Sequence, residues 1–168
     1  LNSGLFKLDV TWATLETLQG SIRPTTSLIM LETPANPTLQ MTDIEEVVRC
    51  AGDIPVLVDS TFATPVLQNP IKHGASMVLH SATKFLGGHG DVMGGVIATS
   101  EAFAQGLRQV RIATGALLHP MGAYMLHRGL QTLPARIRTA QATCEQIAHF
   151  LESHAAVKNV FYPGLSDT

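Results

Sequence analysis

Short, unbroken runs of branched apolar residues recur along this chain and predict four buried β-strands. The runs span residues 28–31, 56–58, 77–79 and 96–98. None of them alternates between apolar and polar positions, which is typical of strands whose sheet is covered on both faces. The pattern therefore favours a buried and mostly parallel sheet.

A helix is predicted between the first two strands. Thr42 and Glu45 have the spacing of a capping box, which marks the start of a helix. The apolar residues that follow share one helical face: Ile44, Val47, Val48 and Ala51. Gly52 then supplies the stop signal at the C-terminal end.

Helical spacing returns after the fourth strand, at residues 101–107, 121–130 and 134–153. In the last segment, apolar residues at steps of three and four predict one core-facing stripe. These residues are Ile137, Ala140, Cys144, Ile147 and Leu151. Strands that alternate with helices predict an α/β fold, in which an open sheet carries helices on both faces.

The composition is that of a folded domain, because 45% of the residues are hydrophobic and only 14% are charged. A formal charge of −2 without a basic run argues against nucleic-acid binding. The apolar runs are too short to cross a membrane. Cys50 and Cys144 follow no metal-ligand spacing, and we expect reduced thiols in a cytoplasmic protein.

Polar residues follow three of the predicted strands. The first strand runs into residues 32–37, the second ends in Asp59, Ser60 and Thr61, and the third ends in residues 80–84. The carboxyl ends of parallel strands meet at one edge of an α/β sheet, where ligands gather. A carboxylate, an amine, several hydroxyls and an amide are therefore expected along one rim.

Lys84 and Asp59 are the most informative pair in this cluster. Alone, each residue would usually be a solvated or turn-forming side chain. Together at neighbouring strand ends they match the needs of pyridoxal phosphate (PLP): an amine that binds covalently and a carboxylate that holds the protonated ring nitrogen. Ser81 and Thr83 flank Lys84 and could donate hydrogen bonds to a phosphate.

Other chemistries fit the sequence poorly. The glycine-rich residues 87–95 lack the third glycine of a dinucleotide fingerprint, because Met93 occupies its place. Gly95 is followed by Val96 rather than by the Lys of a phosphate loop. The spacing of the histidines disfavours a metal site, and a GxSxG hydrolase elbow does not occur.

Residues 81–91, Ser-Ala-Thr-Lys-Phe-Leu-Gly-Gly-His-Gly-Asp, resemble the signature of the PLP enzymes of Cys/Met metabolism. This family includes cystathionine γ-synthase, cystathionine γ-lyase, cystathionine β-lyase and methionine γ-lyase. Four further blocks resemble family segments in the same order: 32–37, 58–63, 129–133 and 162–165. Ser60 departs from the Asn that is commoner in the family.

The resemblance implies a role for each matching residue. Lys84 would form the Schiff base with PLP, and Asp59 would pair with the ring nitrogen. Ser81 and Thr83 would contact the phosphate, and Asn36 would lie near the ring oxygen or the substrate carboxylate. The implied fold is the large domain of a fold-type I, aspartate-aminotransferase-like PLP enzyme.

The resemblance also implies that this chain is part of a longer protein. Residues 1–160 would belong to the PLP-binding large domain, and residues 161–168 would begin the connection to a smaller C-terminal domain. The family's further phosphate, ring-stacking and carboxylate-binding residues have no match here. The parent enzyme is expected to be a homotetramer, a dimer of dimers.

The implied function is PLP-dependent C–S bond chemistry on sulfur amino acids or homoserine esters, by γ-elimination or γ-replacement. Such an enzyme would serve trans-sulfuration or methionine metabolism. The alternative is a non-catalytic α/β fragment of such an enzyme that is inactive alone. A third reading, a nucleotide-binding α/β domain, is disfavoured by the interrupted glycine patterns.

Overall fold

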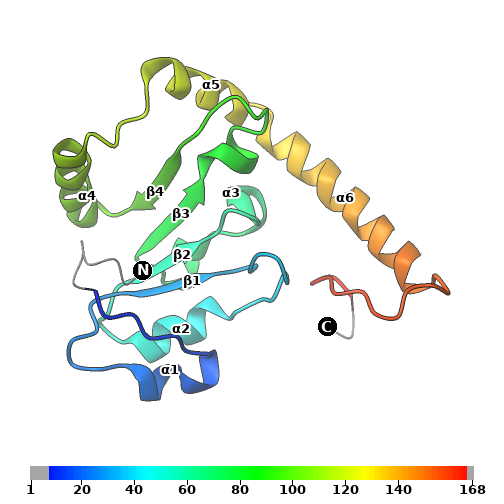
Figure 1. Ribbon diagram of the computed structural model, residues 1–168, viewed down its shortest axis with the longest axis horizontal. Coiled ribbons are helices and arrows are strands. Elements are labelled where there is room, and N and C mark those ends of the chain that lie inside the picture. Colours follow the sequence, from blue (N-terminus) through cyan, green and yellow to red (C-terminus); the bar gives the residue numbers. More distant parts are fainter. Residues whose placement is uncertain (1–7, 166–168) are drawn as a thin grey trace.

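The centre of the molecule is a four-stranded sheet with the strand order β1-β2-β3-β4. The computed structural model describes residues 8–165. The strands are β1 (Ile29–Glu32), β2 (Val56–Asp59), β3 (Met77–Ser81) and β4 (Gly95–Thr99), and they lie side by side in Figure 1. All four are found where the apolar runs predicted them, with bounds that shift by a residue or two.

The strand pairing confirms a mostly parallel sheet. β1 pairs with β2 and β2 pairs with β3 in parallel, whereas β4 is antiparallel to β3. The register sets Glu32 opposite Asp59 and Asp59 opposite Leu79. Because three parallel strands end in step, their carboxyl-terminal residues share one edge of the sheet.

One hydrophobic core lies between this sheet and α2 (Ile44–Ala51). Val56 and Val58, which are almost completely buried, point toward the apolar face of α2, and α1 (Leu15–Ser21) packs beside it. Met30, on the other side of the pleat, is exposed. In the described residues, helices therefore cover the β1–β2 half of the sheet on one face.

The start of α2 differs from the prediction by one residue. The cap is Asp43 rather than Thr42, and its Oδ1 accepts a hydrogen bond from the Glu46 amide at 3.1 Å. The amide of Thr42 donates instead to Thr33 Oγ1 at 3.0 Å, which ties Thr42 to the loop after β1. Gly52 ends the helix as predicted.

A second core lies at the end of β3. It joins the turn η2 (Ala82–Leu86) to α5 (Pro120–Leu130) and α6 (Leu133–Glu152). Its buried residues are Ala82, Leu86, Val92, Leu126, Leu133 and Ile137. This core does not include β1 or β2, so it supports the segment after β3 separately from the first core.

The predicted apolar stripe of α6 is only partly buried, which corrects our expectation. Ile137 is buried, but Ala140, Cys144 and Ile147 are exposed. The reason is visible in Figure 1, where α6 packs on the second core at its start and then runs away from the sheet. The three- and four-residue spacing identifies one face of the helix, but it does not say how far the sheet extends beneath it.

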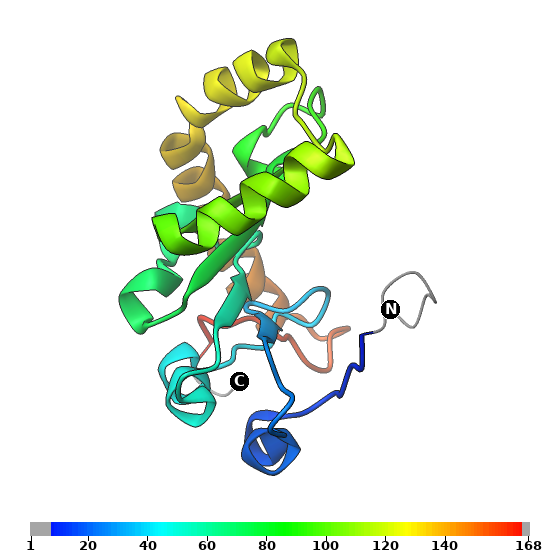
Figure 2. The same cartoon turned by 90° about the vertical axis from the view of Figure 1, so that its left-hand side faces the viewer.

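The remaining elements are helical. α4 (Glu101–Thr114) is longer than predicted because Gly106 does not interrupt it, and it ends at Gly115 in the left-handed region. None of its residues is buried, and none belongs to either core. It lies at the left in Figure 1 and crosses in front of the strands in Figure 2. The β2–β3 connection holds only α3 (Thr64–Leu67) and η1 (Pro70–His73), as its prolines predicted. Within residues 8–165, no helix is both long and apolar enough to span a bilayer.

The shifted cap can be tested by stability measurements. Asp43→Ala removes an acceptor from the first turn of α2 and should lower the free energy of unfolding by about 1 kcal/mol. Thr42→Ala is the matched control and should cost less than about 0.5 kcal/mol, because the Thr42 hydroxyl caps nothing. Urea denaturation of the purified protein measures both. An equal or larger loss in Thr42→Ala would contradict the assignment.

Candidate functional site

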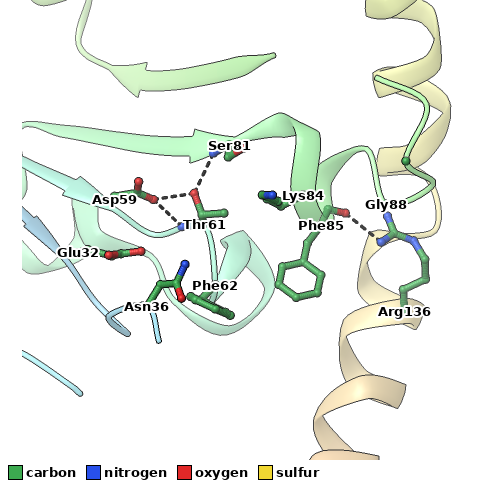
Figure 3. Close-up of a pocket in the computed structure, with 11 residues that line it drawn as sticks. Glu32, Asn36, Asp59, Thr61, Phe62, Ser81, Lys84, Phe85, Gly88 and Arg136 are labelled. Carbon is green, nitrogen blue, oxygen red and sulfur yellow. Dashed lines mark hydrogen bonds between the residues drawn. The ribbon is translucent and has the colours of Figure 1, made fainter. Parts of the chain in front are cut away.

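The three parallel strand ends and the turn after β3 enclose a cavity of about 660 Å³. Figure 3 shows its labelled side chains converging from β1, β2, η2 and α6. The residues that line it are Glu32, Asn36, Asp59, Thr61, Phe62, Ser81, Lys84, Phe85, Gly88, Gly90 and Arg136. The cavity lies where the strand order and the strand ends predicted a ligand site.

Four of the five predicted site residues line this cavity: Asn36, Asp59, Ser81 and Lys84. Thr83 does not. Its hydroxyl accepts a hydrogen bond from the Gly94 amide at 3.0 Å, so Thr83 ties the Lys84 turn to the start of β4. A contact between Thr83 and a phosphate remains a prediction.

Asp59 is held in place by Thr61. Its Oδ1 accepts hydrogen bonds from the Thr61 amide at 3.0 Å and from the Thr61 hydroxyl at 2.6 Å. Thr61 Oγ1 accepts in turn from the Ser81 amide at 2.8 Å, which links the end of β2 to the end of β3 (Figure 3). Among the described residues, no hydrogen bond is formed to Asp59 Oδ2. That oxygen remains available to a ligand.

The chain turns sharply after Asp59. Thr64 has a φ of 60°, in the left-handed region that β-branched residues rarely adopt. Its side chain is fully buried, and its amide donates to Ser60 O at 2.9 Å. Such conformations persist where the surroundings fix them. The turn that presents Asp59 and Thr61 is therefore held by packing on its far side.

Lys84 lies in η2, a turn that is not a regular helix. Its φ and ψ are −86° and −122°, which is outside the helical region. The amides of Gly87 and Gly88 donate to Ala82 O and Lys84 O, both at 2.8 Å. The side chain of Lys84 is exposed and lines the cavity.

Arg136 lines the cavity although the sequence analysis did not select it. Its guanidinium donates three hydrogen bonds at 2.9 Å, to Phe85 O, Gly129 O and Thr132 Oγ1. A sequence signal exists: Arg136 follows Leu133 by three positions and precedes Ile137 by one, so it lies beside the buried stripe of α6. A charge beside a buried stripe requires polar partners.

Two aromatic rings and a second carboxylate complete the lining. The rings of Phe62 and Phe85 are 6.5 Å apart between centroids and tilted by 52°. Glu32 is exposed and lies beside Asp59 across the β1–β2 pair. The cavity thus combines two carboxylates, two cationic side chains and an apolar wall.

His80 is buried directly before Ser81, with 5% of its surface exposed. Within the described part of the chain, its Nδ1 has no hydrogen-bond partner. Burial lowers the pKa of His80 below its usual value, and the charge of Asp59 and the backbone of Ser60 oppose this shift only in part. Burial of His80 therefore favours its neutral imidazole form.

Comparison with protein families gives a match over residues 5–168 to the family described as Cys/Met metabolism PLP-dependent enzyme. The chain is 58% identical to L-methionine gamma-lyase of Brevibacterium aurantiacum, over 98% of this chain and 41% of that protein. It is 52% identical to L-methionine gamma-lyase of Streptomyces avermitilis, over 97% of this chain and 40% of that protein. The chain thus spans about two fifths of the length of these relatives.

The fold is also that of solved structures. Cystathionine gamma-lyase from Lactobacillus plantarum, complexed with L-serine, superposes with a TM-score of 0.88 and 38% identity. The match covers 92% of this chain and 42% of that one. The expected fold class, the α/β fold of fold-type I PLP enzymes, is confirmed. The division into residues 1–160 and 161–168 remains a prediction, and residues 166–168 lie outside the described part.

The buried His80 predicts a pH dependence of stability. Because its folded-state pKa lies below the unfolded value of about 6.5, the unfolded chain takes up a proton first as the pH falls. The contribution of His80 to stability is therefore complete above about pH 6.5 and declines below it, until the folded state is also protonated. Urea denaturation at about pH 7.5 and about pH 5.5 measures this loss.

His80→Gln should remove part of that loss, since Gln does not titrate. His127→Gln is the matched control, because His127 is exposed on α5. A loss in acid that is the same in His80→Gln and in the unmodified protein would show that His80 is not its source.

Proposed function

Because the chain belongs to the Cys/Met metabolism PLP-dependent enzyme family, we propose that it carries the cofactor-binding half of a C–S bond-cleaving active site. The observation that carries the proposal is the presence of Lys84 and Asp59 in one cavity. PLP is the expected cofactor of this family. The activity is proposed for the protein that contains this chain.

The side chains present fit PLP. In the residues that the structure describes, no hydrogen bond is formed to the Lys84 amine, to Asp59 Oδ2 or to the Ser81 hydroxyl, so all three are available. The amine suits the aldehyde of the cofactor as a Schiff-base partner, the carboxylate suits its ring nitrogen, and the hydroxyl suits its phosphate. We propose these roles for them, and a ring-oxygen or substrate contact for Asn36.

The relatives favour an amino acid with sulfur at Cγ as the substrate. Three curated relatives at more than half identity are methionine γ-lyases, which supports γ-elimination from methionine. The likeness to cystathionine γ-lyase keeps cystathionine as a second substrate of the same kind. Replacement at Cγ, including that of a homoserine ester, would use the same residues: the Cγ substituent would leave and a thiol would then form the new bond at Cγ.

When bound, PLP stores the electron pair that remains after a bond at Cα of an amino acid is broken. Lys84 would be the base that accepts the Cα proton of a bound amino acid. In γ-chemistry the same amine then moves a second proton at Cβ. Asp59 would supply the negative charge that favours the protonated form of the ring nitrogen.

The family likeness also supports a proposal for assembly and location. We propose a homotetramer, built as a dimer of dimers; one face of β1 is exposed and no residue of α4 is buried in the described residues, which leaves surface for such contacts. We further propose a role in trans-sulfuration or methionine metabolism in the cytoplasm. A small amino acid is the expected partner.

Chemical labelling tests the role of Lys84. Borohydride reduction of the PLP-loaded protein should fix the cofactor on the peptide that contains Lys84. Lys84→Ala should lose this label, and its turnover of L-methionine should fall by roughly 10²–10⁴-fold or more, because a general base is removed.

The matched control is Lys72→Ala. Lys72 is exposed in η1 and does not line the cavity, so label and turnover should both be kept. A label that maps to Lys72, or that persists in Lys84→Ala, would exclude Lys84 as the attachment site.

A further inference from the structure

We propose that Arg136 is a positioning residue for Lys84, which it holds at a fixed place relative to Asp59. The proposal rests on the proposed function insofar as Lys84 is the residue that binds the cofactor. It concerns the backbone on either side of Lys84 rather than the Lys84 amine itself.

The guanidinium of Arg136 joins two segments that are far apart in sequence. Nη1 donates to Phe85 O, directly after Lys84, and Nη2 donates to Gly129 O at the end of α5. Nε donates to Thr132 Oγ1, which fixes the plane of the fork. One side chain of α6 thereby connects the Lys84 turn to α5; Figure 3 shows the bond to Phe85.

Close packing at glycines leaves this connection little freedom. A Cβ on Gly129 would overlap with Gly87 O, so the end of α5 lies directly against the backbone of the turn. Gly88 has a φ of +74°, and a Cβ there would overlap with the guanidinium of Arg136. The turn, α5 and Arg136 are therefore closely packed, which restricts movement of the Lys84 turn relative to α5.

Lys84 is thus anchored on both sides by side chains. Before it, the Ser81 amide donates to Thr61 Oγ1, the same hydroxyl that donates to Asp59. After it, Phe85 O accepts from Arg136. Lys84 O accepts from the Gly88 amide within the turn, but the backbone dihedral angles of Lys84 are not helical. The Thr61 and Arg136 anchors therefore add to that single bond, one on each side of Lys84.

A lysine at position 136 could not replace this arginine. The donors of an ammonium group all lie on one nitrogen at the end of a flexible chain. The guanidinium of Arg136 is planar and donates its three hydrogen bonds from three separate nitrogens. Arg136→Lys should therefore behave much like Arg136→Met, which keeps the length of the aliphatic stem and removes every donor.

Hydrogen exchange of the cofactor-free protein tests the proposal without reference to activity. In Arg136→Met and Arg136→Lys, the amides of Gly87 and Gly88 should exchange roughly tenfold faster or more, because both amides bond within the turn. Arg138→Met is the matched control. Arg138 is exposed on the same helix, and exchange in the turn should stay unchanged.

A second measurement concerns the loaded protein. The pH midpoint of the visible absorption of bound PLP should shift in both Arg136 variants and not in Arg138→Met, because the Lys84 amine would be displaced relative to Asp59. If the unmodified protein binds no PLP, the proposed function fails, while the exchange result still decides the role of Arg136.

Three outcomes would overturn the proposal. If the Arg136 variants show unchanged exchange at Gly87 and Gly88 and lose only affinity for PLP, Arg136 is a direct ligand of the cofactor. If amide exchange in β2 and α2 accelerates as much as it does in the turn, Arg136 contributes to the stability of the whole fold and not to the position of Lys84. Full rescue of exchange and midpoint by Arg136→Lys would show that charge suffices and that the fork does not matter.

Discussion

The parallel pairing of β1, β2 and β3 is the constraint on which the site depends. Their register sets Glu32 beside Asp59 and brings the end of β3 to the same edge, so residues from three separate segments share one cavity. A slip of one residue would turn the Asp59 side chain to the other face of the sheet. Burial of Val56 and Val58 against α2 opposes such a slip, because it would expose both valines.

The pairing alone does not orient Lys84, which lies beyond the last residue of β3. Its place depends on the second core, where η2 packs against α5 and α6. Thr61 joins the two parts of the site, because its hydroxyl donates to Asp59 and accepts from the Ser81 amide. The carboxylate is thus held by the sheet and the amine by a turn, and a single hydroxyl connects them.

Strand positions, the α/β class and the Lys84–Asp59 pair were all predictable from the sequence, because each depends on local patterns or on the order of strand ends. The α2 cap was not, since Thr42 and Asp43 are both good capping residues and a contact with distant Thr33 decides between them. The exposed half of α6 was missed because periodicity does not reveal what covers a face. Arg136 was missed because its place beside the buried stripe of α6 is only a weak signal, and two of its three partners are backbone carbonyls, which the sequence does not identify.

The most direct test of the account is the effect of Asp59→Asn on turnover in the PLP-loaded protein. Asparagine keeps an oxygen that can accept from Thr61, so the local structure should persist, but it removes the negative charge that the register places at the cavity. A charge-assisted hydrogen bond contributes roughly 1.5–3 kcal/mol, so turnover should fall by at least about 10- to 150-fold while PLP stays attached to Lys84. Turnover of Asp59→Asn equal to that of the unmodified protein would contradict the central claim that the chemistry at Lys84 depends on the carboxylate that the parallel register brings to the cavity.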